Sequence, residues 1–538
     1  MTAYYLIRDV RVPIQANRPD LKETASLALD VPISHIESAT LVKESIDARK
    51  RSAISWLWQI EVVLTEPLKH TGQNVAALNT LSSDLSKPQG LNRSVASPSH
   101  PVIVVGSGPA GLFCALALAD AGVKTQLIER GQPVEPRMRD IGQLRSKGVL
   151  NPESNVCFGE GGAGTYTDGK LYTRIKHPFV KWVMGQLVQY GAPPQILVDA
   201  HPHLGTDRLM RIIQNIRHHL LDRGVDIQFN TRMDVLLQKD GRVAGIRDQT
   251  GKEITGDRVV LAIGHSARDT FNMLHEIGVA MEPKSFAVGV RAEHPQNLIN
   301  QAQYGDSSVA EILGAAEYRL TCQVETEFGT RGVYSFCMCP GGLIVPTPTE
   351  PGQMVVNGMS NANRSARFAN SGIVVQVEPE DLVRAGFENH PLMGLAFQQQ
   401  LESRCYAAVG QPYFAPAMTI EDFLANRHSG KLLTSDFRPG IQACDLNELL
   451  PPWLVVPMRT ALRNFGRKIK GYETGMLLAV ESRSSSPLRI TRGIHMQSIN
   501  TKGLYPVGEG AGYAGGIISA AVDGLKAAEQ ILTELSVK

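Results

Sequence analysis

The stretch HPVIVVGSGPAGLFCALALADAGVKTQLIERG, residues 100 to 131, decides the fold of this chain of 538 residues. Its apolar run Val102 to Val105 is typical of a buried parallel strand, and the glycine pattern G-S-G-P-A-G follows immediately. Leu112 to Ala121 is then predicted to form a helix, which Gly122 closes. A second short strand is expected in KTQLIER. Strand, glycine loop, helix and strand in this order predict a dinucleotide-binding βαβ unit.

Each glycine of this loop has its own physical reason. Gly106 permits the tight turn after the strand, Gly108 lets the backbone approach a pyrophosphate, and Gly111 allows the helix to pack closely on the strand. Pro109 and Ala110 lie at the start of the helix, whose unpaired N–H groups and positive dipole end would face the phosphates. We therefore expect these five residues to contact the dinucleotide.

Glu129 ends the second strand, eighteen residues after the last glycine. A carboxylate at this place can accept hydrogen bonds from both hydroxyls of an unphosphorylated ribose. We predict that Glu129 and the neighbouring Arg130 contact the adenosine half of the cofactor. FAD and NAD share this half, so the stretch alone does not distinguish them.

A second glycine-rich segment lies near the end of the sequence, YPVGEGAGYAGGIISAAVDGLKAA at residues 505 to 528. It resembles the C-terminal FAD motif of the glutathione-reductase-like flavoprotein superfamily, although that superfamily usually has Asp where this chain has Glu509. The resemblance implies that the helix beginning at Ile517 starts close to the flavin pyrimidine edge, where its N–H groups would stabilise negative charge. The cofactor contacts that it implies are Gly508, Glu509, Gly515, Gly516 and Ile517.

The middle of the sequence is similar to the second half of the FAD-binding fold in the same superfamily. Thr206 is a plausible N-cap for a helix that Gly224 closes, and strand-like segments follow. The resemblance implies that the backbone near Met233 meets the adenine and that Gly264, in LAIGH, passes close to the cofactor. No second glycine fingerprint for NAD(P)H is visible, so we expect FAD as a resident prosthetic group.

Further stretches narrow the resemblance to one family. CFGEGGAGTYTDGKLYTR (157 to 174), YSFCMCPGG (334 to 342), NGMSNANRSARFANS (357 to 371) and ESRSSSPLRI (481 to 490) are similar to a bacterial family of FAD-dependent proteins named "NAD(FAD)-utilising dehydrogenase". By analogy with related flavoproteins, the loop from Gly159 to Lys170 runs along the cofactor. We expect contacts from Gly161, Gly162, Gly164 and Lys170.

The fold class expected is α/β: a Rossmann-like FAD-binding fold with an inserted substrate or cap domain rich in antiparallel strands, and a small N-terminal α+β domain. The predicted boundaries are 1–84 for the small domain, 85–98 for a linker, 99–285 and 471–538 for the FAD-binding domain, and 286–470 for the cap domain. In the small domain, Trp56, Trp58, Ile60 and Val62 alternate with mostly polar neighbours, which indicates a half-buried strand.

Composition gives the broad class of protein. The chain is 43% hydrophobic and 20% charged with a formal net charge of +2, so nothing favours nucleic acid or an anionic membrane as a partner. The longest apolar run contains glycines and a proline near its start, so we predict no membrane span. The start, MTAYYLIRDVRVPI, lacks the apolar stretch of a secretory signal, and seven cysteines without zinc-finger spacing fit a reducing compartment. We expect a cytoplasmic protein without a metal site.

No motif identifies a catalytic acid or base, but three groups of side chains are candidates for chemistry. Cys337 and Cys339 form a Cys-x-Cys pair on a predicted strand, where Cys339 could face the flavin, exchange thiols or simply fill the core. His201 and His203 flank a proline and suggest a turn or a substrate channel. Arg483, followed by three serines, could bind an anion or belong to a satisfied loop.

The expected function is a FAD-dependent oxidoreductase of the dehydrogenase or reductase type, which exchanges hydride or electrons between flavin N5 and an unidentified small organic molecule. Its electrons would come from NAD(P)H, from a protein donor or from the substrate itself. Two alternatives stay open: a FAD-dependent monooxygenase, and a flavin-bearing RNA-binding or scaffold protein that uses the N-terminal domain for recognition.

Overall fold

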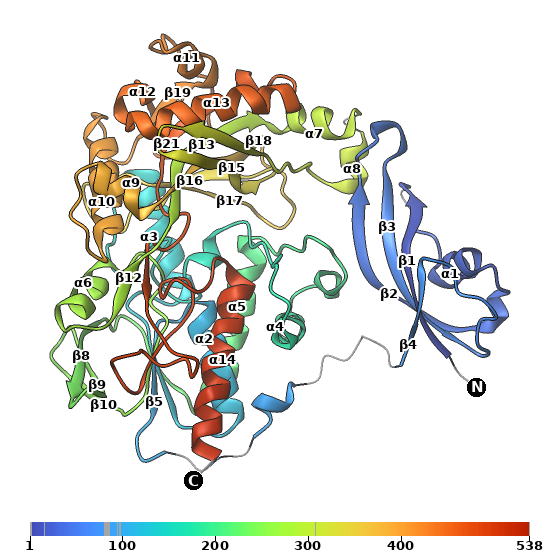
Figure 1. Ribbon diagram of the computed structural model, residues 1–538, viewed down its shortest axis with the longest axis horizontal. Helices are drawn as coiled ribbons and strands as arrows, with labels where there is room; N and C mark the ends of the chain where they lie inside the picture. Colours follow the sequence, from blue (N-terminus) through green and yellow to red (C-terminus); the bar gives the residue numbers. More distant parts are fainter. Residues whose placement is uncertain are drawn as a thin grey trace.

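The computed structural model describes residues 3–15, 17–79, 87–93, 95, 98–306 and 308–536 (Figure 1). The end of the predicted small domain and the first residues of the predicted linker, 80–86, lie outside this description. The protein has three parts: a small N-terminal unit, a unit built on a parallel sheet, and a unit built on a large antiparallel sheet.

The N-terminal unit is a four-stranded antiparallel sheet covered by one helix. The strands β1 (Ala3–Pro13), β2 (Ile36–Asp47), β3 (Ser55–Leu64) and β4 (Val75–Leu78) are ordered β2-β3-β1-β4, and α1 (Leu21–Leu29) packs on them. Trp56, Trp58, Ile60 and Val62 are buried, as their alternation predicts. Asp20 caps α1 by accepting hydrogen bonds from two backbone N–H groups, which explains why the helix begins there.

The N-terminal unit is joined to the rest by backbone pairing as well as by the chain. Glu44, in the outer strand β2, donates its N–H to the Val198 carbonyl across 2.7 Å and accepts from the Ala200 N–H across 2.8 Å. Leu91, which falls within the predicted linker, is fully buried in the core of the parallel-sheet unit. Leu91 therefore anchors this part of the linker in that core.

The second unit has five parallel strands, and its two faces bury different residues of the same strands. β5 (Val102–Val105), β6 (Thr125–Ile128), β7 (Asp226–Gln228), β11 (Val259–Leu261) and β23 (Leu504–Pro506) are ordered β23-β11-β5-β6-β7. Val102 and Val104 pack on one face against α2 (Pro109–Asp120), α4 (Pro178–Gln189), α5 (Thr206–Asp222) and α14 (Ile517–Ser536). Ile103 and Val105 face α6 (Arg268–Glu276) and the small sheet of β8 (Met233–Lys239), β9 (Arg242–Asp248) and β10 (Glu253–Thr255).

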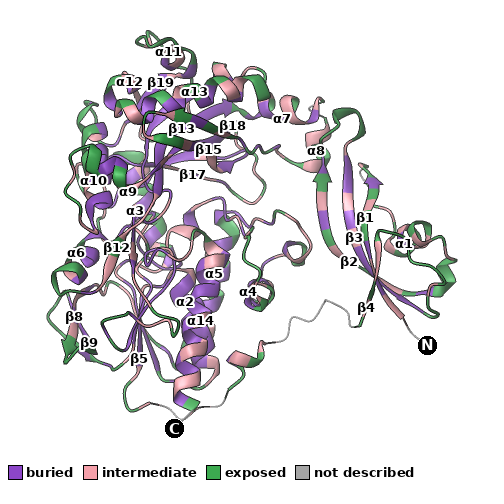
Figure 2. Ribbon diagram, viewed as in Figure 1, coloured by how far each residue is buried: buried purple, intermediate pink, exposed green. Residues whose placement is uncertain are grey.

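Helix α2 is hydrophobic all round because other elements cover it on every side. Its residues from Ala110 to Ala119 are all buried, and they form the purple centre of this unit in Figure 2. The prediction of strand, glycine loop and helix is thereby confirmed, and the sheet has the Rossmann-like parallel order.

One helix start differs from the prediction. The N-cap of α5 is Gly205, at φ +74°, and not Thr206, which is already the first helical residue. The Thr206 hydroxyl donates instead to the Thr167 carbonyl across 2.9 Å. The threonine thus connects the helix to the loop that precedes Lys170, a tertiary contact that the local capping pattern does not reveal.

The third unit is built on a seven-stranded sheet, which is antiparallel except for its last pair. The strands in order are β14 (Thr321–Thr326), β15 (Gly329–Cys339), β18 (Phe368–Val377), β13 (Phe286–Pro295), β21 (Met476–Glu481), β19 (Ala415–Thr419) and β20 (Ile441–Ala443). β16 (Leu343–Pro346) pairs with β17 (Val356–Met359) beneath it, and α10 (Met393–Ala407) and α13 (Pro452–Lys468) pack on its core.

The remaining elements surround this sheet and connect it to the parallel one: α3 (Val134–Lys147), α7 (Gln296–Tyr304), α8 (Val309–Leu313), α9 (Pro379–Arg384), α11 (Ile420–Ala425), α12 (Leu446–Leu449), and the strand pair β12 (Met281–Pro283) and β22 (Leu488–Ile490). The inserted domain is therefore rich in antiparallel strands, as predicted. Strand β21 belongs to this sheet, although the predicted boundary at residue 471 assigned it to the FAD-binding domain; the other boundaries stay a prediction.

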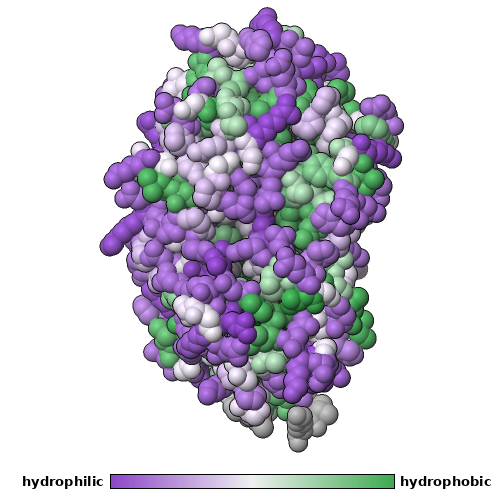
Figure 3. All heavy atoms as spheres, turned by 90° about the vertical axis from the view of Figure 1, so that its left-hand side faces the viewer, coloured by the Kyte–Doolittle hydropathy of each residue, from purple (hydrophilic) through white to green (hydrophobic). Residues whose placement is uncertain are grey.

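The surface beside α6 and α10 is mainly hydrophilic, with scattered hydrophobic residues (Figure 3). Among the described residues, no helix is both long enough and apolar enough to span a membrane.

Candidate functional site

A cavity of ≈ 380 Å³ opens where the carboxyl ends of β5, β6, β11 and β23 meet the antiparallel sheet. In open α/β sheets this edge is where ligands bind. All of the predicted cofactor residues except Gly111 and Gly161 line its wall: Gly106, Gly108, Pro109, Ala110, Glu129, Arg130, Gly162, Gly164, Lys170, Met233, Gly264, Gly508, Glu509, Gly515, Gly516 and Ile517. Segments separated by up to four hundred residues in the sequence thus surround one space.

The glycine loop after β5 has the backbone that its spacing predicts. Gly106 is at φ +101°, where a side chain is strained, and a methyl group there would lie 2.4 Å from the Ala262 carbonyl oxygen. A methyl group on Gly111 would lie 1.8 Å from the Gly106 carbonyl oxygen, so this glycine serves helix–strand packing. Gly108 has open space beside it, with no atom closer than 3.8 Å to an added methyl.

The start of α2 fits a pyrophosphate. Gly108 is the N-cap and offers no side chain to satisfy the first N–H groups of the helix. These N–H groups and the positive end of the helix dipole point to the place where Gly108 lines the cavity. The donors, the open space and the absence of a capping side chain at Gly108 are what a bound diphosphate requires.

The loop from Gly159 to Lys170 runs along this glycine loop. The Gly161 N–H donates to the Ser107 carbonyl across 2.9 Å, and a methyl on Gly162 would approach the Gly108 Cα to 2.9 Å. Only glycines allow the two backbones to approach each other this closely. Gly161 therefore holds the two loops together from behind the wall, while Gly162 and Gly164 line the cavity.

Arg137, on α3, fixes the same loop and was not predicted from the sequence. Its side chain is fully buried, and its guanidinium donates to the carbonyls of Asn155, Val156, Glu160 and Gly162 across 2.6 to 2.9 Å. One arginine thus satisfies four carbonyl groups of a segment that has little regular secondary structure. Nothing in the local sequence distinguishes Arg137 from an exposed helical arginine.

Glu129 connects three segments of the adenosine end. One of its carboxylate oxygens accepts hydrogen bonds from the backbone N–H and the hydroxyl of Ser107, across 2.9 and 2.8 Å. The other accepts from the N–H groups of Gly131 and Gly159, across 2.9 and 3.0 Å. Contact with ribose hydroxyls stays a prediction, but the structure adds a role: the carboxylate holds the turns that form this end of the cavity.

Glu129→Gln should weaken FAD binding and lower the free energy of unfolding by about 1–3 kcal/mol. The amide nitrogen would replace one of the two carboxylate oxygens. Either the N–H groups of Gly131 and Gly159, or the N–H and hydroxyl of Ser107, would then be buried without an acceptor. Fluorescence titration with FAD and urea unfolding of the FAD-free protein measure the two effects. Glu282→Gln, in an exposed pair with Arg489, is the control; equal effects of both substitutions would contradict the role assigned to Glu129.

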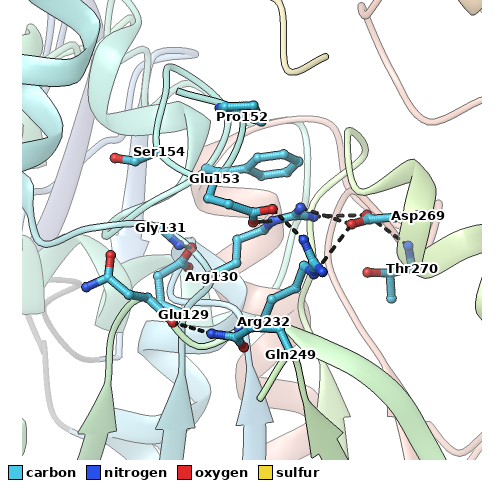
Figure 4. A network of polar contacts seen from close by, with 12 residues as sticks. Glu129, Arg130, Gly131, Pro152, Glu153, Ser154, Arg232, Gln249, Asp269 and Thr270 are labelled. Carbon is cyan, nitrogen blue, oxygen red and sulfur yellow. Dashed lines mark hydrogen bonds and ion pairs between the residues drawn. The ribbon is translucent and has the colours of Figure 1, made fainter. Parts of the chain in front are cut away.

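Arg130 lies in a charged network at the adenosine end (Figure 4). Its guanidinium donates to Glu153 across 2.9 Å, makes two hydrogen bonds of 2.9 Å with Asp269, and lies 4.0 Å from the ring centroid of Phe158. Arg232, after β7, binds the same Glu153. Arg130 thus lines the cavity with a side chain already held by two carboxylates.

The C-terminal motif forms the opposite wall. The Gly508 N–H donates to Asp523 of α14 across 2.8 Å, which ties the turn to the helix. Burial raises the pKa of Glu509 to about 7, and Lys284 opposes this rise. Gly515 and Gly516 have no neighbour within 4 Å of an added methyl, so the start of α14 is open toward the cavity, as the resemblance implies.

The far end of the cavity is formed by Lys170 and by residues of the antiparallel sheet. The Lys170 ammonium pairs with Asp168 across 2.8 Å and donates to the Met338 carbonyl. Asp168 is buried and also accepts hydrogen bonds from Arg364 and from the Ser360 hydroxyl. Two cations thus share one carboxylate at this end.

Of the alternatives left open for the cysteine pair, the structure favours the core-filling one for Cys339. Cys337 lines the cavity, whereas Cys339 is fully buried and does not reach its wall. The pairing of β15 with β18 shifts register between Phe336 and Cys339, and Cys337 is at φ +43°. This irregularity breaks the alternation of the strand and turns Cys337, not Cys339, toward the cavity.

The other candidates are engaged with the protein. Arg483 lines the cavity but donates to Glu402 across 3.1 and 2.7 Å and to Thr349 across 2.8 Å, which favours the satisfied loop over an anion site. His201 contacts Glu317 across 3.1 Å, and His203 contacts the Ala362 carbonyl across 3.0 Å. Neither histidine is in the wall of the cavity.

Several wall residues were not predicted as cofactor contacts. They are Phe158, Thr231, Arg232, His265, Ser266, Phe336 and Asn357. His265 interrupts the expected strand end in LAIGH; burial, together with the positive charges of Arg483 and Arg268, lowers its pKa to about 4. The sequence showed the histidine at this place but not the reason for it. Asn357 begins the stretch 357 to 371 that carried the family resemblance, but nothing there indicated a cofactor contact.

Comparisons with known proteins agree with this geometry. Residues 101–138 match a family described as a FAD binding domain, residues 285–484 match "FAD-dependent protein, C-terminal domain-like", and residues 6–63 match a domain of unknown function. An "Uncharacterized protein" of Clostridium beijerinckii is 41% identical over 533 residues, 98% of each chain. A 2,4-dichlorophenol 6-monooxygenase of Delftia acidovorans is 27% identical over 213 residues, 36% of this chain and 34% of that one.

Among solved structures, the flavin-dependent brominase Bmp2 matches with a TM-score of 0.37 and 11% identity, over 82% of this chain and 80% of that chain. Likeness at this level carries no functional information.

The parallel sheet, the glycine loop and the matched FAD-binding segment together define a flavoprotein with FAD as its cofactor, broadly of the oxidoreductase class. Within that class, the chain belongs to the same family as the clostridial protein.

Proposed function

We propose that the protein is a FAD-dependent dehydrogenase or reductase that acts on a small organic molecule, as the similarity to "NAD(FAD)-utilising dehydrogenase" sequences suggests. Its electrons would come from NAD(P)H, from a protein donor or from the substrate. The observation that carries the proposal is the extent of the cavity: it runs from the pyrophosphate position at α2 to a far end lined by Phe336 and Cys337 of the antiparallel sheet. FAD would supply hydride or electron exchange at its ring, and the residues lining this cavity would hold it.

The chain's own residues would bind and orient the two reactants. The N–H groups at the start of α2 hold the phosphates, and Glu129 fixes the adenosine end. The N-terminus of α14, opened by Gly515 and Gly516, offers N–H groups to negative charge on the ring. Phe336, on β15 of the seven-stranded sheet, and Asn357, on β17 beneath it, line the cavity and would help to exclude water from it.

Anaerobic stopped-flow reduction of the purified yellow protein by NADH and by NADPH tests this function. We expect flavin bleaching that saturates with the concentration of one nucleotide, and turnover with an artificial acceptor under nitrogen. Bleaching by neither nucleotide would assign the electrons to another donor. Protein that retains no flavin and does not rebind added FAD would contradict the proposal.

A second candidate is a monooxygenase, which the 27% identity to the 2,4-dichlorophenol 6-monooxygenase over a third of the chain favours. It requires oxygen consumption driven by NAD(P)H and coupled to a hydroxylated product. Measuring oxygen uptake against product separates the two candidates, because a dehydrogenase works with an artificial acceptor in the absence of oxygen.

A further inference from the structure

Two side chains at the far end of the cavity keep N–H donors that no described residue accepts. Lys170 and Asn357 both line the wall there. They come from different units of the protein: Lys170 ends the loop that begins at Gly159, and Asn357 lies on β17, beneath the seven-stranded sheet. Donors that reach a cavity without a protein acceptor are a place for the oxygen of a ligand.

The hydrogen bonds of Asn357 fix the orientation of its amide. The Oδ1 atom accepts from the Gly358 N–H across 2.7 Å and from the Arg291 guanidinium across 3.2 Å. Both partners are donors only, so the amide oxygen must face them and the NH2 group must face away. Arg291 is itself held firmly, because its fully buried guanidinium pairs with Glu481 across 2.6 Å. Among the described residues, none accepts a hydrogen bond from this NH2 group.

The ammonium of Lys170 has one N–H left over. It donates to Asp168 across 2.8 Å and to the Met338 carbonyl, whereas an ammonium group has three N–H donors. The backbone of Lys170 is bridged to that of His203, so the lysine is fixed at its base as well as at its tip. The third donor is therefore held in place at the wall of the cavity.

Both donor groups are tied to the same short piece of β15. Arg291, which orients Asn357, also donates to the Cys337 carbonyl across 3.3 Å. Lys170 donates to the next carbonyl along the chain, that of Met338. One peptide segment of the antiparallel sheet thus positions a charged donor from one unit and a neutral donor from the other.

The carboxylate at this end of the cavity is already saturated. One Asp168 oxygen accepts from Lys170 and Arg364, and the other accepts from Arg364 and the Ser360 hydroxyl. Two donors on each oxygen use the acceptor capacity of a carboxylate. Glu509 also lines the cavity, but it lies in the turn after β23, in the opposite wall. The end at Lys170 and Asn357 therefore combines free donors with an occupied acceptor.

We propose that Lys170 and Asn357 together bind a ligand oxygen that only accepts hydrogen bonds, that of a carboxylate or a carbonyl. The ammonium supplies a charge-assisted hydrogen bond, and the amide adds a neutral one with a fixed direction. The inference rests on the proposed function and names its substrate class, a small carboxylic acid or carbonyl compound. A carbonyl of the flavin ring can bring the same kind of oxygen, so the test has one arm for each source.

Titration of the FAD-bound protein with acetate and with benzoate, followed through the flavin absorption spectrum, tests the site without turnover. Ethylamine and benzylamine, which carry N–H donors in place of the acceptor oxygens, are the matched probes. Asn357→Asp replaces the NH2 group by an oxygen and keeps the acceptor for Gly358 and Arg291. We expect it to lower the affinity for the carboxylates about ten- to a hundredfold and not to lower the affinity for the amines.

Two further variants complete the comparison. Lys170→Met removes the charged donor while Arg364 still pairs with Asp168, so carboxylate affinity should fall by a similar factor. Asn389→Asp, in the exposed loop before α10, adds the same charge away from the cavity and should leave carboxylate affinity unchanged. Urea unfolding shows whether each variant is folded, and Lys170→Met decides the outcome if Asn357→Asp does not fold.

The affinity of the same variants for FAD is the second arm. Loss of carboxylate affinity with unchanged FAD affinity assigns the two donors to the substrate, whereas loss of FAD affinity assigns them to a carbonyl of the flavin ring. The proposal is overturned if neither variant lowers the affinity for the carboxylates or for FAD. These outcomes are independent of the stopped-flow result, because binding to the oxidised protein requires no electron transfer.

Discussion

Replacing Gly108 with alanine should lower the affinity for FAD by about ten- to a hundredfold and leave the fold intact. The backbone at Gly108, φ −71° and ψ −178°, is open to any residue, and an added methyl meets no atom within 3.8 Å. That methyl would, however, enter the cavity where the phosphates approach the start of α2. FAD titration by fluorescence and urea unfolding of the FAD-free protein separate binding from stability.

Two other glycines provide the controls. Gly142→Ala, inside α3 with no neighbour within 4 Å, should retain FAD affinity and stabilise the helix slightly. Gly111→Ala should reduce stability and binding together, because its methyl would overlap the Gly106 carbonyl. If Gly108→Ala bound FAD as well as Gly142→Ala does, the phosphates would not lie at this helix start.

Glu402→Gln should destabilise the protein by about 3–5 kcal/mol, because it removes the paired carboxylate of buried Arg483 and leaves buried Arg268 only its longer contact of 3.5 Å with Glu350. The Glu402 carboxylate on α10 is fully buried and pairs with Arg268 across 2.9 Å and with Arg483 across 2.7 Å. The Ser482 hydroxyl also donates to it, across 2.6 Å. Since Arg483 lines the cavity, FAD affinity should fall as well.

The pH dependence gives a second readout. Burial would raise the pKa of Glu402, but Arg483 and Arg268 outweigh it and lower the pKa from 4.5 to about 2. Its contribution to stability is therefore present above pH 4.5 and is lost as the pH falls from there toward 2. The difference in unfolding free energy between the wild type and Glu402→Gln, measured with urea, should shrink over that range.

Glu253→Gln is the matched control, since its pair with Arg247 is exposed and should contribute less than about 1 kcal/mol. An effect of Glu402→Gln no larger than that of this control would contradict the role of the buried ion pair.

The part of the fold that the sequence predicted well depends on local geometry. The glycines at 106 and 111 have no alternative that fits, so their spacing alone located the turn, the helix and the cofactor loop. Trp56, Trp58 and Ile60 predicted a buried strand face because alternate side chains of a strand point to the same side. Each of these patterns lies within a segment of about thirty residues or fewer, so no distant residue is needed to read it.

The parts that escaped prediction depend on distant partners. Cys337 faces the cavity because β15 loses register against β18, and the sequence of β15 alone does not reveal that shift. Arg483 is satisfied by Glu402, eighty-one residues away, and Arg137 by carbonyls of a separate loop. Thr206 looked like a cap because its tertiary partner, the Thr167 carbonyl, is invisible in the helix pattern.

The place of β23 and α14 has a consequence for the order of events during protein synthesis. β23 is an outer strand of the parallel sheet, beside β11, and α14 packs on α2, yet residues 504–536 are made long after β5 and α2. The glycine loop at residues 106–111 therefore leaves the ribosome some four hundred residues before Gly508, Glu509 and Gly516, which complete the opposite wall of the cavity. Retention of FAD should therefore require that residues 504–536 have been synthesised, and flavin colour would report that β23 and α14 have docked.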